Sequence, residues 1–338
     1  MPETARERLI QYIRGHQLAA IVHVAAKLEL ADRVGTGCRI DVLAQHTRTD
    51  VSALERLLRA LAAYGIFAID SQRWVRPTEL SGYLTSGPPE SLHAAALFFA
   101  LPMNWRCWEA LEQAVRGEAE VFATVHGQTM FQYLEKHPAE SVRFHEFMSH
   151  SPDERQRAVI DAYDFSQATH IIDVGGGTGA LLCAIMQRHA AASGTLYETA
   201  SVRTNALRHL SAQGLCGRCR FVLGDFFVSV PAGGDLYILS QILHDWGDED
   251  CRTILLRCRD AMRPGTKMLL IERLVGCEAS ANHTTNYLSD LEMLLVLGSR
   301  ERTAEAYGEL LLEAGLRATR VIATASPFWI VEAVRSRD

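Results

Sequence analysis

One stretch of the sequence joins an apolar run, an acid and a cluster of glycines. Residues 169–174 are apolar and β-branched enough for a buried strand ending at Asp173, and a second apolar run begins at Leu181. The glycines between them, including Gly175 and Gly177, can adopt positive φ and let a ligand touch the backbone. A helix that starts there points its free N–H groups at such a ligand. The stretch predicts a turn that holds a nucleoside-bearing cofactor; the alternative is a tight turn that binds nothing.

Two more acids follow the next strands of the pattern. Glu198 lies 21 residues beyond Gly177 (198 minus 177), the usual distance for a carboxylate that accepts hydrogen bonds from ribose hydroxyls. Asp225, which follows Gly224, could accept a hydrogen bond from an adenine amino group while Phe226 covers the face of the ring. These side chains therefore form a second part of the predicted cofactor site.

The choice of cofactor depends on Asp173. Gly175-x-Gly177-x-x-Ala180 also satisfies the dinucleotide fingerprint, so the glycines and Glu198 fit NAD as well as S-adenosylmethionine. A carboxylate at the end of the first strand suits an ammonium and a sulfonium group and would repel a pyrophosphate. The residues favour S-adenosylmethionine, with S-adenosylhomocysteine as product, over a nicotinamide-dependent oxidoreductase.

His244 is the candidate catalytic base. It follows an apolar strand at residues 236–240, which places it over the same crevice as the acids. A neutral imidazole near its ordinary pKa of about 6.5 suits proton abstraction from a phenol, and methyl transfer to the oxygen requires no metal. The alternative is a histidine at a helix start that bonds only to the backbone.

From about residue 169 strands alternate with helices, which is typical of a doubly wound parallel sheet in an α/β protein. The last two strands are so close in sequence that we expect a hairpin at one edge. The helix before the fifth strand is predicted to begin with Asp248 as its N-cap. The predicted strands are residues 169–174, 194–199, 219–223, 236–240, 267–273, 317–322 and 328–333.

Residues 4–166 have helical periodicity almost throughout. The first helices carry apolar residues on more than one face, which predicts burial against a second subunit in a homodimer. Helices at residues 40–44 and 51–64, followed by a hairpin at 65–76, are typical of a winged helix-turn-helix. Few basic residues accompany it, so a dimerisation module is favoured over a DNA-binding regulator.

The chain has 338 residues with a formal net charge of −6, and its basic residues are scattered, which argues against nucleic acid as a partner. Its apolar runs are too short to cross a membrane, and its start lacks a signal-peptide pattern, so a cytoplasmic protein is expected. Most of the eight cysteines sit singly in apolar patterns. Cys216 and Cys219 form a close pair, but without further ligands nearby they do not indicate zinc.

Several motifs in order make the chain similar to the class I small-molecule O-methyltransferases, the group that includes plant caffeic acid, animal hydroxyindole and bacterial polyketide O-methyltransferases. The resemblance implies a helical, winged-helix-like dimerisation domain over residues 1–166 and a Rossmann-like methyltransferase domain over 167–338. The motifs are Asp173-Val174-Gly175-Gly176-Gly177-Thr178-Gly179, Gly224-Asp225-Phe226-Phe227, Leu243-His244-Asp245-Trp246, Met262-Arg263-Pro264-Gly265 and Arg300-Glu301-Arg302-Thr303.

The resemblance also implies roles for further residues. Two carboxylates, Glu272 and Glu301, match the pair that flanks the catalytic histidine, where they would orient the ring and stabilise an imidazolium. Three positions match cofactor contacts, with the tryptophan against the adenine: Ser240, Ser151 and Trp246. Five positions would face an aromatic acceptor: Trp105, Phe131, Met148, Asp290 and Met293. Core packing is the alternative for Phe131 and Met148.

The sequence therefore predicts methylation of a phenolic or enolic hydroxyl of an aromatic natural product. Similar scaffolds also carry out hydroxylation or rearrangement with the bound sulfonium, and a nitrogen acceptor is a further alternative. One departure from the family pattern concerns the ribose site, where Glu198-Thr199-Ala200 replaces the usual Asp-Leu-Pro. Glu198 reaches further than aspartate, so ribose recognition would need a shifted backbone.

Overall fold

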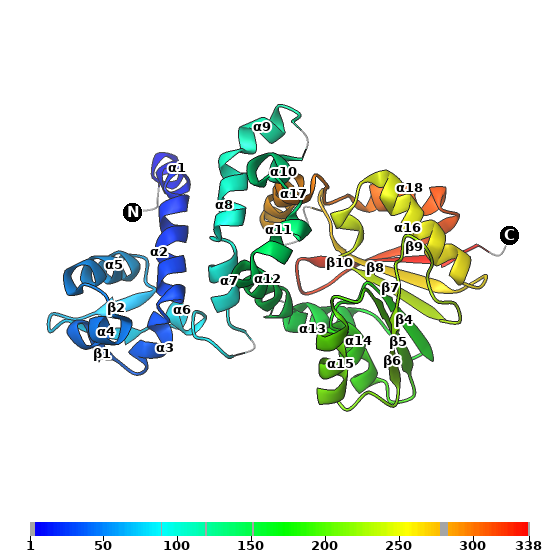
Figure 1. The fold of residues 1–338 in the computed structure, drawn as a ribbon, viewed down its shortest axis with the longest axis horizontal. Helices are drawn as coiled ribbons and strands as arrows, with labels where there is room; N and C mark the ends of the chain where they lie inside the picture. The colour runs from blue at the N-terminus through cyan, green and yellow to red at the C-terminus, as the bar shows by residue number, and fades with distance from the viewer. Residues whose placement is uncertain (1–3, 89, 119, 151, 278–282, 337–338) are drawn as a thin grey trace. The chain divides into compact units, whose positions relative to one another are not determined.

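The computed structural model describes residues 4–88, 90–118, 120–150, 152–277 and 283–336. It divides into two compact units, unit 1 with residues 1–109 and 131–151 and unit 2 with residues 110–130 and 152–338 (Figure 1). Each unit has a hydrophobic core of its own. Within the described ranges, no helix combines the length and apolar character that crossing a membrane needs. The domain boundary predicted at residue 166 stays a prediction.

Unit 1 is mostly helical, with a small sheet in the strand order β1-β3-β2. Helix α5 (Val51–Ala63) begins after Asp50, whose side chain accepts a hydrogen bond from the Ala53 N–H, and it buries Leu54 and Leu58 on one face. The other elements of unit 1 are α1 (Ala5–Ile13), α2 (Gly15–Lys27), α3 (Leu30–Val34), β1 (Cys38–Arg39), α4 (Ile40–Thr47), β2 (Phe67–Ile69), β3 (Trp74–Pro77), α6 (Glu79–Gly82), α7 (His93–Phe98), α8 (Pro102–Glu109), α11 (Met130–Lys136) and α12 (Pro138–His150).

Helices α4 and α5 and the β2–β3 hairpin follow one another as the winged-helix pattern predicts. The charges on this element pair with one another. Glu55 of α5 forms ion pairs with Arg59 and Arg73, each at 2.7 Å. Because both arginines are engaged by the Glu55 carboxylate, they are less available to phosphates, which favours a protein interface over DNA for this element.

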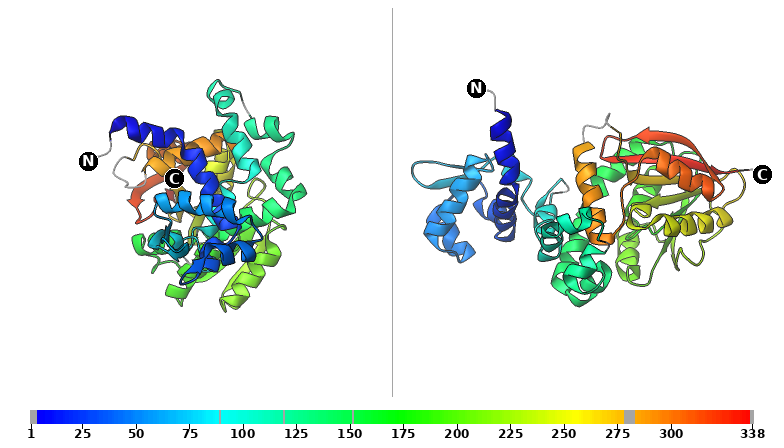
Figure 2. Two further views of the ribbon diagram at one scale, coloured as in Figure 1. Left: turned by 90° about the vertical axis from the view of Figure 1, so that its left-hand side faces the viewer. Right: turned by 90° about the horizontal axis from the view of Figure 1, so that it is seen from above.

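Helix α1 is the dark blue helix next to the N-terminus in Figure 2. It presents apolar side chains to solvent in the single chain. Leu9 is 58% exposed, Tyr12 69% and Ile13 66%, and the helix buries no residue. Val24 of α2 is 39% exposed as well. Neighbouring apolar residues with this exposure indicate a surface that another protein covers.

Unit 2 contains a seven-stranded sheet in the order β6-β5-β4-β7-β8-β10-β9. All seven predicted strands are present, and the last two pair as the predicted hairpin, with β9 at the edge. Strands β4 to β8 pair in parallel, whereas β10 runs antiparallel to both of its neighbours, β8 and β9, so the doubly wound sheet is mixed. The short β9–β10 connection forces this reversal. The strands are β4 (His170–Val174), β5 (Ser193–Glu198), β6 (Cys219–Leu223), β7 (Leu236–Ser240), β8 (Lys267–Arg273), β9 (Leu316–Ala323) and β10 (Phe328–Arg335).

Helices cover both faces of this sheet, and alternate strand residues point to opposite faces. Ile171 of β4 packs with helices α13, α14 and α15, whereas its neighbour Ile172 packs with α16 and α18. The helices of unit 2 are α9 (Leu111–Val115), α10 (Val121–His126), α13 (Pro152–Ala162), α14 (Ala180–Arg188), α15 (Arg203–Ala212), the 3₁₀ helix η1 (Leu243–Asp245), α16 (Asp248–Ala261), α17 (His283–Leu297) and α18 (Ala304–Glu313).

The start of α16 differs by one residue from the prediction. Gly247 occupies the N-cap position and Asp248 is the first helical residue. The Asp248 carboxylate forms ion pairs with Arg300 and Arg302 instead of capping the helix. These pairs tie α16 to the loop that carries Glu301.

Candidate active site

The glycine turn joins β4 to α14. Gly175, Gly177 and Gly179 have φ of 70°, 58° and 79°, which other residues rarely adopt. A Cβ on Gly175 would lie 2.6 Å from Ile242, and one on Gly176 would collide with the Asp173 carboxyl, whereas one on Gly177 would meet no atom within 4 Å. The turn is therefore closely packed by the protein itself at Gly175 and Gly176, whereas the space beside Gly177 is open.

Two acids lie at this turn, as predicted from sheet geometry. Asp173 is buried, and burial together with the Glu198 carboxylate raises its pKa to about 7 although Arg155 opposes the shift. Glu198 accepts a hydrogen bond from the Gly177 N–H at 3.3 Å. Within the described part of the chain, Asp173 Oδ1 and the buried Ser240 Oγ have no hydrogen-bond partner. Unsatisfied buried oxygens of this kind fit a ligand that brings ammonium and hydroxyl donors.

Three aromatic side chains, Phe226, Phe227 and Trp246, form a cluster beside the glycine turn. The Phe226 ring comes within 3.4 Å of the Cβ position of Gly175, and its centroid is 6.2 Å from that of Trp246. Phe227 packs edge-on against the same Trp246 at 4.7 Å. Asp225 is exposed, and its Oδ1 accepts a hydrogen bond from the Phe227 N–H at 2.8 Å. The predicted adenine contacts Phe226 and Trp246 are thus neighbours.

Gly224 has a packing role that the sequence did not reveal. A Cβ there would collide with the ring of Tyr197, whose hydroxyl donates to the Ser229 carbonyl at 2.6 Å. The absence of a side chain at Gly224 therefore lets β5 and the loop after β6 approach closely.

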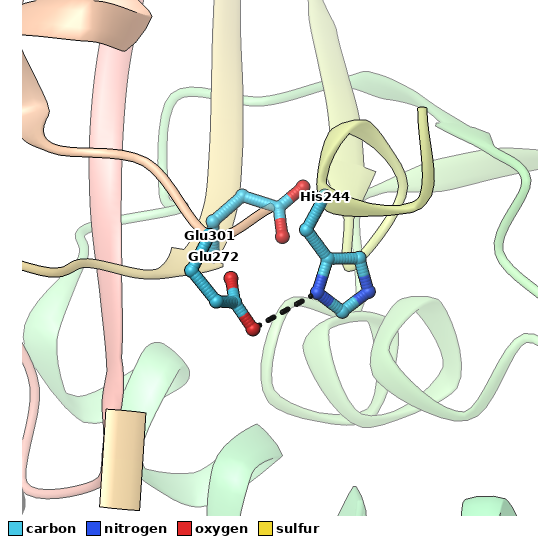
Figure 3. Close-up of side chains that lie close together, drawn as sticks. All are labelled: His244, Glu272 and Glu301. Carbon is cyan, nitrogen blue, oxygen red and sulfur yellow. Dashed lines mark hydrogen bonds and ion pairs between the residues drawn. The ribbon is translucent and has the colours of Figure 1, made fainter. Parts of the chain in front are cut away.

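His244 lies beside the carboxylates of Glu272 and Glu301 (Figure 3), and Asp245 is at the other ring nitrogen. Nδ1 is 3.2 Å from Glu301 Oε1, and Nε2 is 3.2 Å from Asp245 Oδ1. Donor atoms of His244, Glu272 and Glu301 all lie within 4.8 Å of one another, and the three residues are buried. The structure therefore brings together the three residues predicted to be catalytic.

Backbone geometry positions the histidine and Glu272. Gln241, at the end of β7, has a positive φ of 56° and directs the chain into η1. Glu272 ends β8, and its Oε1 accepts hydrogen bonds from the N–H groups of Ile242 at 3.0 Å and Leu243 at 2.9 Å. Burial raises the pKa of Glu272 to about 7, although His244 opposes the shift. Glu272 thus fixes the turn that precedes His244.

Glu301 is held by helix α17. Its Oε1 accepts a hydrogen bond from the Ser289 hydroxyl at 2.9 Å, and its backbone N–H donates to Asp290 Oδ1 at 2.9 Å. Arg302, next in the chain, is buried and donates to the carbonyls of Leu243 and Trp246. The loop before α18 is therefore locked to both α17 and η1, so Glu301 has a defined position against the imidazole.

The pKa of His244 departs from the expected value. Burial lowers it, but the carboxylates of Asp245, Glu272 and Glu301 outweigh burial and raise the pKa to about 10. The ordinary pKa expected for this imidazole therefore does not hold in the structure. The upward shift favours the doubly protonated, positively charged ring at neutral pH.

The same cluster is the group of possible metal ligands found among the described residues. The imidazolium already supplies the positive charge that its carboxylates need. Cys216 and Cys219 belong to no such group there, and both thiols are free.

The predicted acceptor residues divide between the units. Asp290 and Met293 are half-buried on α17 of unit 2, close in sequence to the Ser289 that contacts Glu301. Trp105 lies half-buried on α8 of unit 1. Phe131 is 50% exposed and Met148 39% exposed, so core packing does not account for either side chain. Ser151 lies outside the described residues.

The sequence did not single out three residues of the site. Asp245 was part of a motif but had no role, and Ser289 had no local signal. Arg155 is a buried cation whose pKa falls to about 10 because of burial, with Asp173 and Glu272 opposing the shift. Its place between these two acids follows from the packing of α13 against the sheet, which no spacing in the sequence indicates.

The sheet order, the glycine turn after β4 and the acids on β4 and β5 define a Rossmann-like methyltransferase fold. Family models support this class over most of the chain. An O-methyltransferase domain matches residues 108–317, and an O-methyltransferase dimerisation domain matches residues 10–87.

Full-length relatives give the same assignment. The phenazine O-methyltransferase PhzM of Lysobacter antibioticus is 38% identical over 326 residues, which cover 96% of this chain and 95% of that protein. The crystal structure of LaPhzM has a TM-score of 0.91 at 36% identity and covers 98% of this chain and 100% of its own. NcsB1 from neocarzinostatin biosynthesis, solved with S-adenosylmethionine and 2-hydroxy-5-methyl naphthoic acid, has a TM-score of 0.79 at 30% identity, covering 94% and 96%.

The chain belongs to the O-methyltransferase family. It is an S-adenosylmethionine-dependent O-methyltransferase with an N-terminal dimerisation domain.

Proposed function

We propose that this enzyme methylates a phenolic or enolic hydroxyl of an aromatic natural product, with His244 as the general base. One observation supports this proposal: His244 Nδ1 contacts Glu301, and Glu272 lies beside them. This cluster is at the same end of the sheet as the glycine turn, where Asp173 and Glu198 lie. A base and a cofactor cradle at one sheet edge fit a reaction between a bound donor and a bound acceptor.

The cofactor would bind along the acids and aromatic rings of unit 2. Asp173 and Ser240 offer free oxygens for the ammonium end, Glu198 for the ribose, and Asp225 for the adenine amino group, with Phe226 and Trp246 against the adenine ring. S-adenosylmethionine supplies an electrophilic methyl group on a sulfonium when bound. Gly175 and Gly177 let the backbone approach it, while Gly224 serves packing. Ser151 remains a proposed contact from the family resemblance.

The raised pKa of His244 suits a phenol. A phenol with a pKa near that of tyrosine, about 10, matches an imidazolium whose pKa is about 10, so proton transfer between them is close to thermoneutral. Glu272 and Glu301 then stabilise the imidazolium that results. The acceptor oxygen would attack the methyl group while its proton passes to Nε2.

From the family resemblance, Trp105, Phe131 and Met148 of unit 1 stay proposed acceptor contacts, and so do Asp290 and Met293 of unit 2. The exposure of Phe131 and Met148 supports a role other than core packing. The aromatic acid bound to NcsB1 supports an aromatic acceptor.

One relative represents a different reaction. The aclacinomycin 10-hydroxylase RdmB of Streptomyces purpurascens is 34% identical over 299 residues. The intact His244–Glu301 contact favours methyl transfer here. A product heavier by one methylene, rather than by one oxygen, in a mass spectrum distinguishes the two reactions.

We also propose a homodimer formed through the dimerisation domain, since α1 and α2 expose Tyr12, Ile13 and Val24. The free state of all eight cysteines fits a reducing, cytoplasmic location.

A screen of phenols with the wild-type enzyme, followed by His244→Ala, tests the assigned reaction. Loss of the base should lower kcat by about 10²–10⁴-fold, while S-adenosylhomocysteine binds with unchanged affinity in calorimetry. Full turnover in His244→Ala would rule out His244 as the base.

A further inference from the structure

Both nitrogens of the His244 ring face carboxylates. Glu301 Oε1 lies 3.2 Å from Nδ1, and Asp245 Oδ1 lies 3.2 Å from Nε2. The Glu301 contact is a hydrogen bond, and the Asp245 contact is an ion pair. Negative charge on both sides of the ring favours the imidazolium form, which has no lone pair and takes no proton. With Asp245 at Nε2, the base is therefore held in the form that cannot accept a proton.

The two contacts differ in how firmly they are held. Glu301 is fully buried as a side chain, and Ser289 and Asp290 bind its carboxylate and its backbone. The Asp245 side chain is 28% exposed, and within the described residues no other donor bonds to its carboxylate. Nε2 is therefore the side from which a carboxylate can leave, and the neighbouring Nδ1 contact keeps the ring in place.

We propose that Asp245 is a positioning residue that occupies Nε2 of His244 in the resting enzyme and is displaced by the acceptor hydroxyl. This inference rests on the proposed role of His244 as base. Productive binding then replaces the ion-pair partner Asp245 with the acceptor hydroxyl at the same nitrogen atom. Asp245 competes with the acceptor and keeps the base protonated until the acceptor arrives.

The proton balance of this exchange is defined. The imidazolium Nε2 and the neutral phenol each carry one acidic proton. The reactive pair has only one proton between Nε2 and the phenolic oxygen. One proton therefore passes to solvent when the acceptor binds. Methyl transfer then forms the oxygen–carbon bond and breaks the sulfur–carbon bond, and the remaining proton stays on His244. A lower pKa of His244 makes the first proton easier to release.

Several groups face the ring and set this pKa. Asp245 comes from η1, Glu272 from the end of β8, and Glu301 from the loop before α18. From α17, Ser289 contributes a neutral hydroxyl. From α18, the buried Tyr307 hydroxyl couples to the two glutamates and is neutral at all relevant pH, because burial raises its pKa well above the ordinary value. Removing the charge of Asp245 alone should therefore lower the pKa of His244 and leave the buried pair intact.

The test is Asp245→Asn in the full-length enzyme. Asparagine keeps the shape and can still accept from Nε2–H, but it removes the charge. ¹⁵N NMR of histidine-labelled enzyme, with the His244 signals assigned by their loss in His244→Ala, reports the pKa of the ring without any acceptor. We expect the titration midpoint to fall by about one to two pH units. Glu249→Gln is the matched control, because it removes one exposed charge from the start of α16 and should leave the midpoint unchanged.

Kinetics with the phenol identified in the screen give the second measurement. In Asp245→Asn the alkaline rise of kcat/KM should move to lower pH, KM for the acceptor at neutral pH should fall, and kcat on the high-pH plateau should stay within about threefold of wild type. Asp245→Glu, which restores a carboxylate, should return the profile toward wild type.

An unchanged midpoint in Asp245→Asn would overturn the proposal, as would a plateau kcat lower by about 100-fold, which would mean that Asp245 acts on the reacting atoms. A misfolded variant is recognised by lost affinity for S-adenosylhomocysteine in calorimetry, and Asp245→Ser then takes its place with the same expectations. Failure of the proposed reaction would leave the NMR result interpretable, because that measurement needs no turnover.

Discussion

His244 shows how strongly its neighbours determine the chemistry of one side chain. An isolated imidazole titrates near pH 6.5, and burial alone would lower its pKa further. The three carboxylates around the ring reverse the sign and raise the pKa to about 10. This raised pKa fits the proposed role of His244 as a base for a phenol better than a role toward a group that ionises near neutral pH.

Glu301 provides a test at this scale. In Glu301→Gln the amide oxygen can still accept from Nδ1–H, but the charge that stabilises the imidazolium is lost. Because a partner of this kind both orients and charges the ring, we expect kcat to fall by about 10–100-fold with unchanged affinity for S-adenosylhomocysteine. Glu309→Gln, an exposed acid on α18, should behave as wild type. Equal kcat values for the two variants would contradict the assigned role of Glu301.

At the scale of elements, the β4–α14 turn serves two purposes at different glycines. Gly176 has no room for a side chain because the Asp173 carboxyl and Leu196 occupy the space. Gly177 has open space but a left-handed backbone with φ of 58°. Close packing therefore requires glycine at position 176. At position 177 the left-handed backbone favours glycine, and the open space would let a ligand approach.

Alanine at each position should separate these purposes. Gly176→Ala overpacks the turn and should reduce the free energy of unfolding by about 1–3 kcal/mol. Gly177→Ala should cost only about 1 kcal/mol of strain but weaken S-adenosylhomocysteine binding, because the new methyl group points into the ligand space. Urea unfolding and calorimetry on both variants provide the comparison. Unchanged cofactor affinity in a folded Gly177→Ala protein would show that the turn does not face the ligand.

At the scale of the whole molecule, the apolar face of α1 is the feature that the single chain leaves unsatisfied. Its residues Leu9, Tyr12 and Ile13 lie at helical spacing and bury nothing within the chain. The match of residues 10–87 to a dimerisation domain supports the proposal that a second copy of the protein covers this face.

Charge on this face should prevent assembly. We expect Ile13→Glu to halve the mass measured by light scattering at micromolar concentration, since burying an unpaired carboxylate in an interface is strongly unfavourable. Leu312→Glu introduces the same charge on α18 at a residue that is 71% exposed, and it should remain dimeric. A monomeric mass for the wild type would disprove the dimer itself.

The sequence predicted the strands, the winged-helix pattern and the glycine turn because each depends on local periodicity and on residues with special backbone preferences. The antiparallel β9–β10 hairpin was predicted from the short connection between the two strands. The pairing of β10 with β8 was not predicted, since no pattern inside a strand specifies which strand will lie beside it. His244, Glu272 and Glu301 could be named together only through the resemblance to a family.

By itself, the sequence determined which residues end the strands and therefore which side chains share the crevice of the sheet. Tertiary structure alone decided their state: the Asp245 contact at Nε2, the hold of Ser289 on Glu301 and the charge of His244. The physical reason is that ionisation depends on distances and burial. His244 and Glu301, for example, are separated by 57 residues along the chain, and no local sequence pattern encodes the distance between their side chains.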